Sequence, residues 1–400
     1  MIIKNCIKQN IAFLFSIFLL CFFVRSGTYG KIDSLAECVS TQDGLNDYSY
    51  STTMYKTLES EYSSGLWHAT DFIDLHGRIA NLLNIQGLYS DIGMYLTDDM
   101  YIVSASPYTT TDYEFEELVS LHDFLTENGV NLLYVNAPTK YMNDNMFREQ
   151  FGIDSFSNEN MDVFLSRIKE AGIKSIDLRE YIMEEQLNIR DLFYRTDHHW
   201  TTKTALWAAE KIAEGLNEYC GYDIDLSIYD EENYTFIDRE ECWHGEQGRK
   251  MGATYVGLDN YTEIKPTFHT EYFFNTQKGQ VEGDFNNFID ESTYEADRDV
   301  YNGPSWHYSY LLTSCINKMV PNGKLLLLGD SYSSPMEPFL SLGVHAIDPI
   351  ILREADPNIQ LRDQILKNGY DTVVICYAQF MLGAHDDQRS SNAGMYYFNR

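Results

Sequence analysis

Two short stretches of this 400-residue chain carry the residue types that acyl-transfer chemistry needs. One reads Gly-Asp-Ser-Tyr-Ser at residues 329–333, directly after an apolar run, and places Ser331 in a turn. The other contains Asp197 and His199, two positions apart, directly before a predicted helix. A serine hydroxyl becomes a good nucleophile when an imidazole accepts its proton and a carboxylate holds that imidazole in the correct tautomer. We therefore predict a triad of Ser331, His199 and Asp197.

Both stretches also allow simpler interpretations. Glycine, aspartate and serine are common in ordinary turns, so the residues around Ser331 could simply connect a strand to a helix. Asp197 could be a carboxylate at a helix N-terminus, where negative charge is favoured. Asp197, His198 and His199 could also bind a metal. The sequence offers no further ligand at a convincing spacing, so we predict no metal site and no cofactor.

The segments around these residues alternate between strand and helix patterns. Thr201 or Thr202 caps the helix after His199, and Gly221 follows its end. Strands that alternate with helices predict an α/β fold with a parallel sheet covered on both faces. Ser331 would lie at the carboxyl edge of this sheet, with free amides of the next helix beside it. Strands are predicted at residues 131–135, 175–178, 325–328, 344–347 and 372–376, and helices at 115–125, 161–171, 201–216 and 359–366.

The rest of the chain is less regular. Residues 68–83 fit a helix, and residues 87–103 fit short strands. Residues 221–305 are rich in Tyr, Asp, Glu, Thr and Gly, and we predict an insertion of strands and loops there. The expected organisation has three parts, namely a targeting segment at 1–30, an N-terminal extension with a helix at 31–89, and the α/β domain at 90–400.

The first 30 residues resemble an export signal in composition. Lys4 and Lys8 precede an uncharged run of 14 residues at positions 11–24. This pattern is typical of a secretory signal peptide, and it is short for a bilayer crossing, which takes about 20 apolar residues. No clear cleavage motif follows, so an uncleaved anchor stays open. We expect the remainder to be extracytoplasmic, either secreted or anchored.

The net charge of the chain is −31, which disfavours nucleic acid and anionic membrane surfaces as partners. Five cysteines follow the apolar run. Cys220 and Cys242 could form a disulfide, which the sequence alone does not decide. The five are Cys38, Cys220, Cys242, Cys315 and Cys376.

Together these motifs resemble a known family. Thr-Asp-His-His-Trp-Thr at 196–201, followed by Leu-Gly-Asp-Ser-Tyr at 328–332, is similar to the DHHW proteins and the related alginate O-acetyltransferases. Those proteins carry an SGNH hydrolase-like domain. Residues 135–140, 175–178 and 317–328 supply further matching pieces in the family's order, so the resemblance spans roughly residues 90–380. It implies an SGNH-like fold in which the Asp–His block precedes the serine block, as in the alginate-modifying relatives.

The resemblance also implies roles for residues outside the triad. A glycine between the two blocks would donate a backbone N–H to the oxyanion, with Gly245 the best match and Gly248 the alternative. Asn317 is a candidate for the family's asparagine, although it could equally cap a helix. Lys140 is a candidate for substrate binding. Trp200 could shield the Asp–His pair from water or stack on a sugar ring.

The function implied is an extracytoplasmic, serine-dependent O-acetyltransferase that modifies a cell-surface or secreted polysaccharide through an acetyl-serine intermediate. By analogy with the family, a membrane-bound O-acyltransferase would supply the acetyl group. The strongly negative chain favours a neutral or weakly charged glycan as acceptor. Two alternatives remain, namely a carbohydrate acetylesterase with the same triad and a non-catalytic glycan-binding protein with the same fold.

Overall fold

The computed structural model describes residues 73–75, 77–79, 93–276, 279–289, 294–295, 300–301, 312–356, 358–386 and 390–399. The chain forms two compact units, residues 1–76 and 77–400, and the fold described below belongs to the second. The predicted targeting segment, Cys38 and most of the N-terminal extension lie outside the described residues. Residues 73–75 and 77–79 are helical, as predicted for that stretch. None of the helices in the described ranges is long and apolar enough to span a bilayer.

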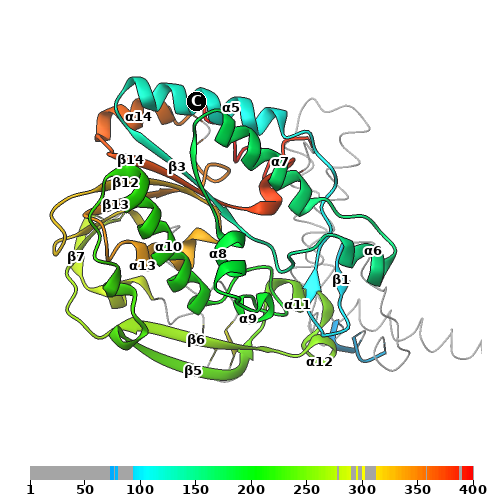
Figure 1. Cartoon of the computed structure of the whole chain (residues 1–400). Helices are drawn as coiled ribbons and strands as arrows, with labels where there is room; N and C mark the ends of the chain where they lie inside the picture. Colours follow the sequence, from blue (N-terminus) through cyan, green and yellow to red (C-terminus); the bar gives the residue numbers. More distant parts are fainter. Residues whose placement is uncertain are drawn as a thin grey trace, which may run out of the picture. The chain divides into compact units, whose positions relative to one another are not determined.

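An eight-stranded sheet forms the centre of this unit, in the order β4-β3-β14-β12-β13-β11-β7-β8 (Figure 1). The first five strands are parallel, which confirms the predicted sheet, and β11, β7 and β8 continue it antiparallel. The strands are β3 (Asn131–Ala137), β4 (Lys174–Asp177), β7 (Tyr272–Thr276), β8 (Gly279–Gly283), β11 (Leu312–Asn317), β12 (Lys324–Gly329), β13 (Ala346–Ile350) and β14 (Thr372–Ala378).

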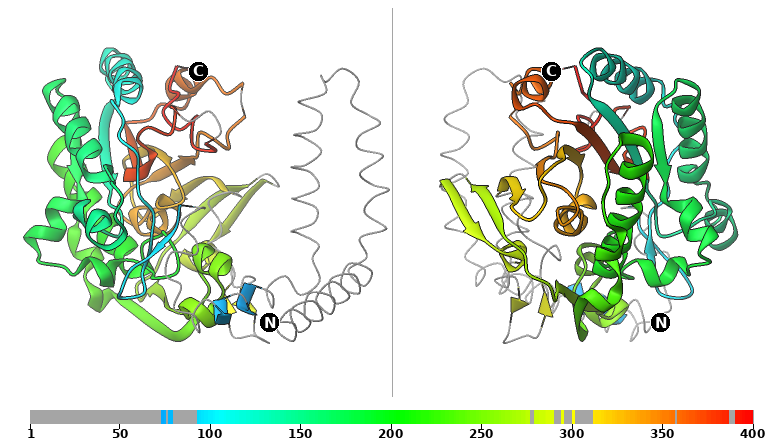
Figure 2. Two further views of the ribbon diagram at one scale, coloured as in Figure 1. Left: turned by 90° about the vertical axis from the view of Figure 1, so that its right-hand side faces the viewer. Right: turned by 60° about the vertical axis from the view of Figure 1, so that its left-hand side comes forward.

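The parallel strands are buried on both faces because helices cover both sides of the sheet. All seven residues of β14 are buried, as are the four consecutive leucines of β12. A continuous apolar run of this kind is what a doubly covered parallel strand needs. The helices α5, α7 and α14 cover one face, and α10 and α13 cover the other (Figures 1 and 2). These helices are α5 (Asp112–Glu127), α7 (Ser157–Glu170), α10 (Thr202–Cys220), α13 (Ser333–Leu340) and α14 (Leu361–Asn368).

The helix α10 directly follows the Asp–His stretch, and its first residue is fixed by a cap. The Thr201 side chain accepts a hydrogen bond from the Thr204 N–H at 3.2 Å. At the other end Gly221 has a φ of 75°, a left-handed conformation that glycine adopts at low cost. Both ends were predicted from the sequence, and the cap determines where the preceding loop must stop.

The predicted insertion is only partly a separate element. Its strands β5 (Tyr234–Trp243) and β6 (Asp259–Pro266) form a second sheet with β9 (Tyr294–Glu295) and β10 (Val300–Tyr301). However, β7 and β8 pair with the main sheet, so part of the segment extends the α/β core. The segment also contains two short helices, α11 (Glu246–Met251) and α12 (Ala253–Val256), which the sequence pattern did not predict.

The remaining elements are short. The predicted strands before residue 103 form the hairpin of β1 (Tyr95–Leu96) and β2 (Ile102–Val103). The helices α6 (Asn145–Phe151), α8 (Leu178–Glu184) and α9 (Ile189–Leu192) were not predicted. Cys220 and Cys242 are both free thiols, so the suggested disulfide between them is absent.

Candidate active site

A cavity of about 630 Å³ lies at the carboxyl ends of the parallel strands. Its wall includes Thr139 and Lys140 after β3, Phe380 after β14, and Ser331 after β12. The loop before α10 adds Asp197, His198 and His199. His199 and Ser331 therefore line one cavity, although they are 132 positions apart in the chain. This is the sheet edge at which open α/β folds bind ligands.

Asp197 and His199 form a close pair. His199 Nδ1 lies 2.7 Å from Asp197 Oδ1, and the Glu246 N–H donates to Asp197 Oδ2 at 2.8 Å. Burial on its own would raise the pKa of the Asp197 carboxyl, but the contacts with His199, the nearby His198 ring and the Glu246 amide together hold that pKa well below its usual range. Asp197 is therefore a carboxylate at neutral pH, which fixes a proton on Nδ1 of His199.

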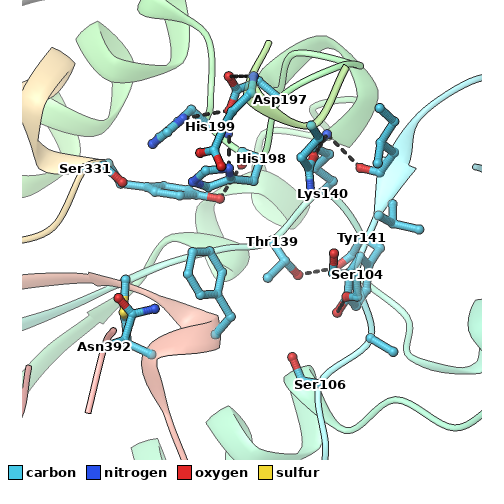
Figure 3. Close-up of a pocket in the computed structure, with 18 of the residues that line it drawn as sticks. Ser104, Ser106, Thr139, Lys140, Tyr141, Asp197, His198, His199, Ser331 and Asn392 are labelled. Atoms are coloured by element: carbon cyan, nitrogen blue, oxygen red, sulfur yellow. Dashed lines mark hydrogen bonds and ion pairs between the residues drawn. The ribbon is translucent and has the colours of Figure 1, made fainter. Parts of the chain in front are cut away.

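Ser331 lies beyond the other edge of the His199 ring. Figure 3 shows the ring between the Asp197 carboxylate and Ser331. Nε2 of His199 is buried and has no hydrogen-bond partner within the described part of the chain. Catalytic hydrogen bonds are often long or unformed without substrate. The order carboxylate, imidazole, hydroxyl is the one that serine activation requires.

The serine turn is held by the carboxylate of Asp330, which is fully buried. Asp330 accepts hydrogen bonds from the N–H of Tyr332 at 2.8 Å and of Ala378 at 2.7 Å. Burial raises the pKa of the Asp330 carboxyl, while these two amides act in the opposite direction. Gly329 permits the turn, because a Cβ there would overlap the Ser333 side chain.

We expected free amides at the start of the following helix to face the site, but the first N–H groups there are bonded within the turn, and the free amide is that of Ser331, two residues before α13. The Tyr332 N–H is bound to Asp330 Oδ1, and the Ser333 N–H donates to the Asp330 carbonyl at 3.0 Å. The Ser331 N–H has no protein partner among the described residues. It is the amide of this turn that an oxyanion could use.

The Asp–His loop is anchored by Asp259 at the start of β6, a residue that sequence reasoning missed. Its Oδ2 accepts from the Thr196 N–H at 2.8 Å and the Thr196 hydroxyl at 2.6 Å, and its Oδ1 accepts from the Arg195 N–H at 2.9 Å. Thr196 is fully buried. An aspartate in a segment rich in acidic residues has no local signal that would single it out.

Gly245 does not fit the predicted role of oxyanion donor. Its N–H donates to the Thr196 hydroxyl at 3.1 Å, and that of the alternative, Gly248, donates to the Thr196 carbonyl at 2.7 Å. A Cβ on Gly245 would lie 2.7 Å from Asp197 Cβ and still closer to the Thr196 carbonyl. Gly245 therefore acts by lacking a side chain, which lets α11 approach and bring the Glu246 amide to Asp197.

Lys140 lines the cavity, but its ammonium group is occupied elsewhere. Nζ donates to the carbonyls of Ile102 at 2.8 Å and Arg195 at 3.1 Å, and to Gln247 Oε1 at 3.3 Å. These acceptors use all three of its N–H bonds. Burial lowers the pKa of Lys140 to about 7. In this arrangement Lys140 holds the Asp–His loop against β2 and α11, and it has no donor left for substrate.

Asn317 and Trp200 lie outside the cavity wall. The Asn317 side chain is buried on β11 and donates to the carbonyls of Ser341 and Leu342, so it has a structural role instead of the predicted one. Trp200 is fully buried and packs on Tyr332 with ring centroids 5.2 Å apart. It cannot stack on a sugar in this structure. It does support Tyr332, whose ring lies beside His199.

Asp197, His198 and His199 have potential metal-ligand atoms within 4.8 Å of one another. The 2.7 Å between His199 Nδ1 and Asp197 Oδ1 is a hydrogen-bond distance. Two ligands of a tetrahedral zinc, each bonded at about 2.0–2.1 Å, stand roughly 3.3 Å apart. The close pair therefore fits a proton relay better than a metal site.

The charge of the cavity differs from that of the chain. Its wall contains the basic side chains of Lys140, Arg249 and Arg353 and the acidic side chains of Asp197 and Glu246. The net charge of −31 consequently gives no guide to the charge of the substrate, and the expectation of a neutral acceptor loses its support.

A protein-family model described as "SGNH hydrolase-like domain, acetyltransferase AlgX" matches residues 94–236. The chain is related to the alginate acetyltransferases. The matched interval includes Asp197 and His199 and ends before Ser331. The chain is also 25% identical over 178 residues to the alginate biosynthesis protein AlgX of Pseudomonas aeruginosa, a match that covers 43% of this chain and 36% of that protein. AlgX of Pseudomonas syringae is 25% identical over 226 residues, covering 54% and 45%.

These matches span less than half the length of the two relatives, but similar solved structures cover more of the chain. PatB1 of Bacillus cereus, solved with a sulfonyl adduct, matches with a TM-score of 0.56 and 18% identity, covering 76% of this chain and 99% of PatB1. A DHHW family protein from Eubacterium siraeum matches with a TM-score of 0.54 and 16% identity, covering 76% and 94%. This relative of the alginate acetyltransferases therefore has the SGNH-like fold that its motifs implied.

Proposed function

We propose that the protein is a serine-dependent O-acetyltransferase that acts on a polysaccharide outside the cytoplasm. The observation that carries this proposal is the placement of the His199 ring between the Asp197 carboxylate and Ser331 at the wall of one cavity. The relationship to acetyltransferases supports the group that is transferred. The proposed location rests on the apolar run at residues 11–24, which lies outside the described residues.

The first half-reaction acetylates the enzyme. His199 Nε2 accepts the proton of the Ser331 hydroxyl as its oxygen attacks the carbonyl carbon of an acetyl donor. The Ser331 N–H stabilises the developing oxyanion. The donor's leaving group takes the proton from His199, and the acetyl ester of Ser331 remains. By analogy with the family, a membrane-bound O-acyltransferase supplies the acetyl group in the cell.

The second half-reaction transfers the acetyl group to a sugar. A sugar hydroxyl enters the cavity and loses its proton to His199 Nε2 as its oxygen attacks the acetyl-serine. The tetrahedral intermediate then collapses, and His199 returns the proton to the Ser331 oxygen. Throughout both steps Asp197 stabilises the imidazolium form of His199 and keeps the ring in place. Water in place of the sugar would release acetate.

Active-site labelling tests the nucleophile. A serine-reactive fluorophosphonate should modify Ser331 of the purified protein, and peptide mass spectrometry should locate the label. A sulfonyl fluoride is a suitable second reagent, because PatB1 was solved with a sulfonyl adduct. Ser331→Ala should lose the label and reduce turnover of p-nitrophenyl acetate by at least about 10³-fold. Ser104→Ala removes another serine at the cavity wall, and this variant should keep both the label on Ser331 and the turnover of p-nitrophenyl acetate.

Product analysis separates the transferase from its alternatives. Incubation with p-nitrophenyl acetate and neutral or uronate-containing oligosaccharides should yield acetylated sugar. Acetate as the only product would identify an esterase. Equal turnover by the wild type and Ser331→Ala would rule out the serine mechanism and leave a glycan-binding role.

A further inference from the structure

His198 is a second imidazole at the cavity wall that the proposed mechanism does not use. Its Nδ1 lies 3.3 Å from Asp197 Oδ1, the same oxygen that His199 approaches. Its ring lies against that of His199 with centroids 3.9 Å apart and a tilt of 37° between the planes, and it meets Phe380 edge-on at 5.9 Å. The Tyr332 hydroxyl donates to the His198 carbonyl. These contacts hold the backbone and the ring in one orientation.

The two imidazoles differ in what their Nε2 atoms face. Nε2 of His199 is buried, and 16% of that side chain is exposed. The His198 side chain is 27% exposed and lines the cavity, and its accessible Nε2 has no hydrogen-bond partner among the described residues. The carboxylate of Asp197 holds a proton on Nδ1 of His199, and its charge 3.3 Å from Nδ1 of His198 favours the same tautomer of that ring. A neutral His198 with its proton on Nδ1 presents a lone pair on Nε2 to the cavity.

His198 remains neutral at physiological pH. Burial and the adjacent His199 ring lower the pKa of His198 to about 3, and Lys140 and Lys250 act in the same direction against the Asp197 carboxylate. A second positive charge beside the imidazolium of His199 would be unfavourable. His198 therefore offers a hydrogen-bond acceptor without competing with His199 for the transferred proton.

We propose that Nε2 of His198 accepts a hydrogen bond from a second hydroxyl of the acceptor sugar, next to the hydroxyl that attacks. His198 would thus be a positioning residue for the acceptor, and this inference rests on the proposed function. A vicinal diol can donate one hydroxyl proton to His198 while the other hydroxyl faces His199. Water or a simple alcohol has no second hydroxyl for this contact. The contact favours transfer to sugars over hydrolysis.

Partitioning of the acetyl-enzyme between two matched alcohols tests this role. The full chain is acetylated with p-nitrophenyl acetate in the presence of equal molar concentrations of 1,2-propanediol and 1-propanol, which differ by one hydroxyl. The two acetate esters are measured by gas chromatography. The wild type should favour the diol. His198→Phe, which removes the acceptor, should lower the diol-to-alcohol ratio by about 3- to 10-fold, the effect of one neutral hydrogen bond.

His198→Gln distinguishes a positioning role of His198 from a purely structural one. The side-chain carbonyl of the glutamine can accept a hydrogen bond near the place of His198 Nε2. This variant should recover part of the diol preference. Fluorophosphonate labelling of Ser331 should proceed at the wild-type rate within about 3-fold in both variants, since neither changes Asp197 or His199.

Each contrary result has a defined meaning. An unchanged diol-to-alcohol ratio in His198→Phe would overturn the role of His198 and leave the proposed function intact. Loss of labelling in both variants would show that His198 acts on the triad and would also overturn the inference. A wild-type protein that forms no acetyl-serine would overturn the proposed function and, with it, this role.

Discussion

The serine turn and the Asp–His loop meet in one cavity, but different parts of the fold hold them. Asp330 ties the serine turn to amides at the ends of β12 and β14, inside the main sheet. The Asp–His loop is tied to Asp259 on β6 and to the first amide of α11, both outside that sheet. The α/β core thus holds the proposed nucleophile, whereas the proposed Asp197–His199 relay depends on the segment at 221–305. Changes in that segment should alter activity more than stability, and changes at Asp330 should do the reverse.

Among the changes that test this comparison, Gly245→Ala should have the largest effect. The added Cβ would overlap Thr196 and Asp197, so either α11 or the loop must move. A displacement of about 1 Å at the relay can lower the rate of acetyl transfer by about 100-fold. Steady-state kinetics with p-nitrophenyl acetate measure this loss. Gly394→Ala, where a Cβ meets no atom within 4 Å, is the matched control. Activity within 3-fold of the wild type would show that contact with α11 does not position Asp197.

Asp330→Asn should mainly affect stability. The asparagine side chain has a single carbonyl oxygen, so one of the buried amides of Tyr332 and Ala378 loses its acceptor. An unsatisfied buried amide costs about 1–3 kcal/mol, and we expect a loss of about 2 kcal/mol in the free energy of unfolding in urea. Asp371→Asn is the control. Asp371 accepts a hydrogen bond from the backbone N–H of Lys324 at the start of β12, but this bond is exposed to solvent. Similar losses in both variants would contradict a special role for Asp330.

Asp259→Asn tests the anchor of the Asp–His loop. Replacing the carboxylate weakens at least one of its bonds to Arg195 and Thr196, and we expect about a 10-fold lower rate of acetyl transfer. The label on Ser331 should form more slowly in proportion. Asp238→Asn changes an exposed carboxylate on the adjacent strand β5 and should have little effect. Equal rates in the two variants would mean that β6 does not hold the relay.

Lys140→Met should change the pH dependence of stability. The pKa of Lys140 is lowered to about 7 from 10.5, so between these values the unfolded chain binds a proton that the folded chain does not. Stability of the wild type relative to Lys140→Met should therefore rise with pH across this window. Between pH 7 and pH 8 the free energy of unfolding of the wild type, relative to that of Lys140→Met, should increase by about 1 kcal/mol, as measured by urea unfolding. A constant difference between the two proteins would contradict this assignment.

The sequence predicted the parts of the molecule that local patterns specify. Apolar runs located β3, β12 and β14, the Thr201 cap located α10, and the motifs brought Ser331, His199 and Asp197 to one sheet edge. The failures concern contacts between distant segments. Nothing near Asp259 shows that it will bind Thr196, and Gly245 could be matched to a motif without revealing that its amide is already bonded. Lys140 was a substrate-binding candidate from the family resemblance alone, whereas its amino group is bonded to the carbonyls of Ile102 and Arg195 and to Gln247.

The position of β14 in the sheet affects when the cavity can form. It lies between β3 and β12, and it is the last strand in the described part of the chain. The early strands β3 and β4 and the later strands β12 and β13 meet only through it. Contacts between such distant segments form slowly, because a long loop must close first. The parallel part of the sheet, whose carboxyl edge carries the cavity, is therefore complete only once residues 372–378 have joined it.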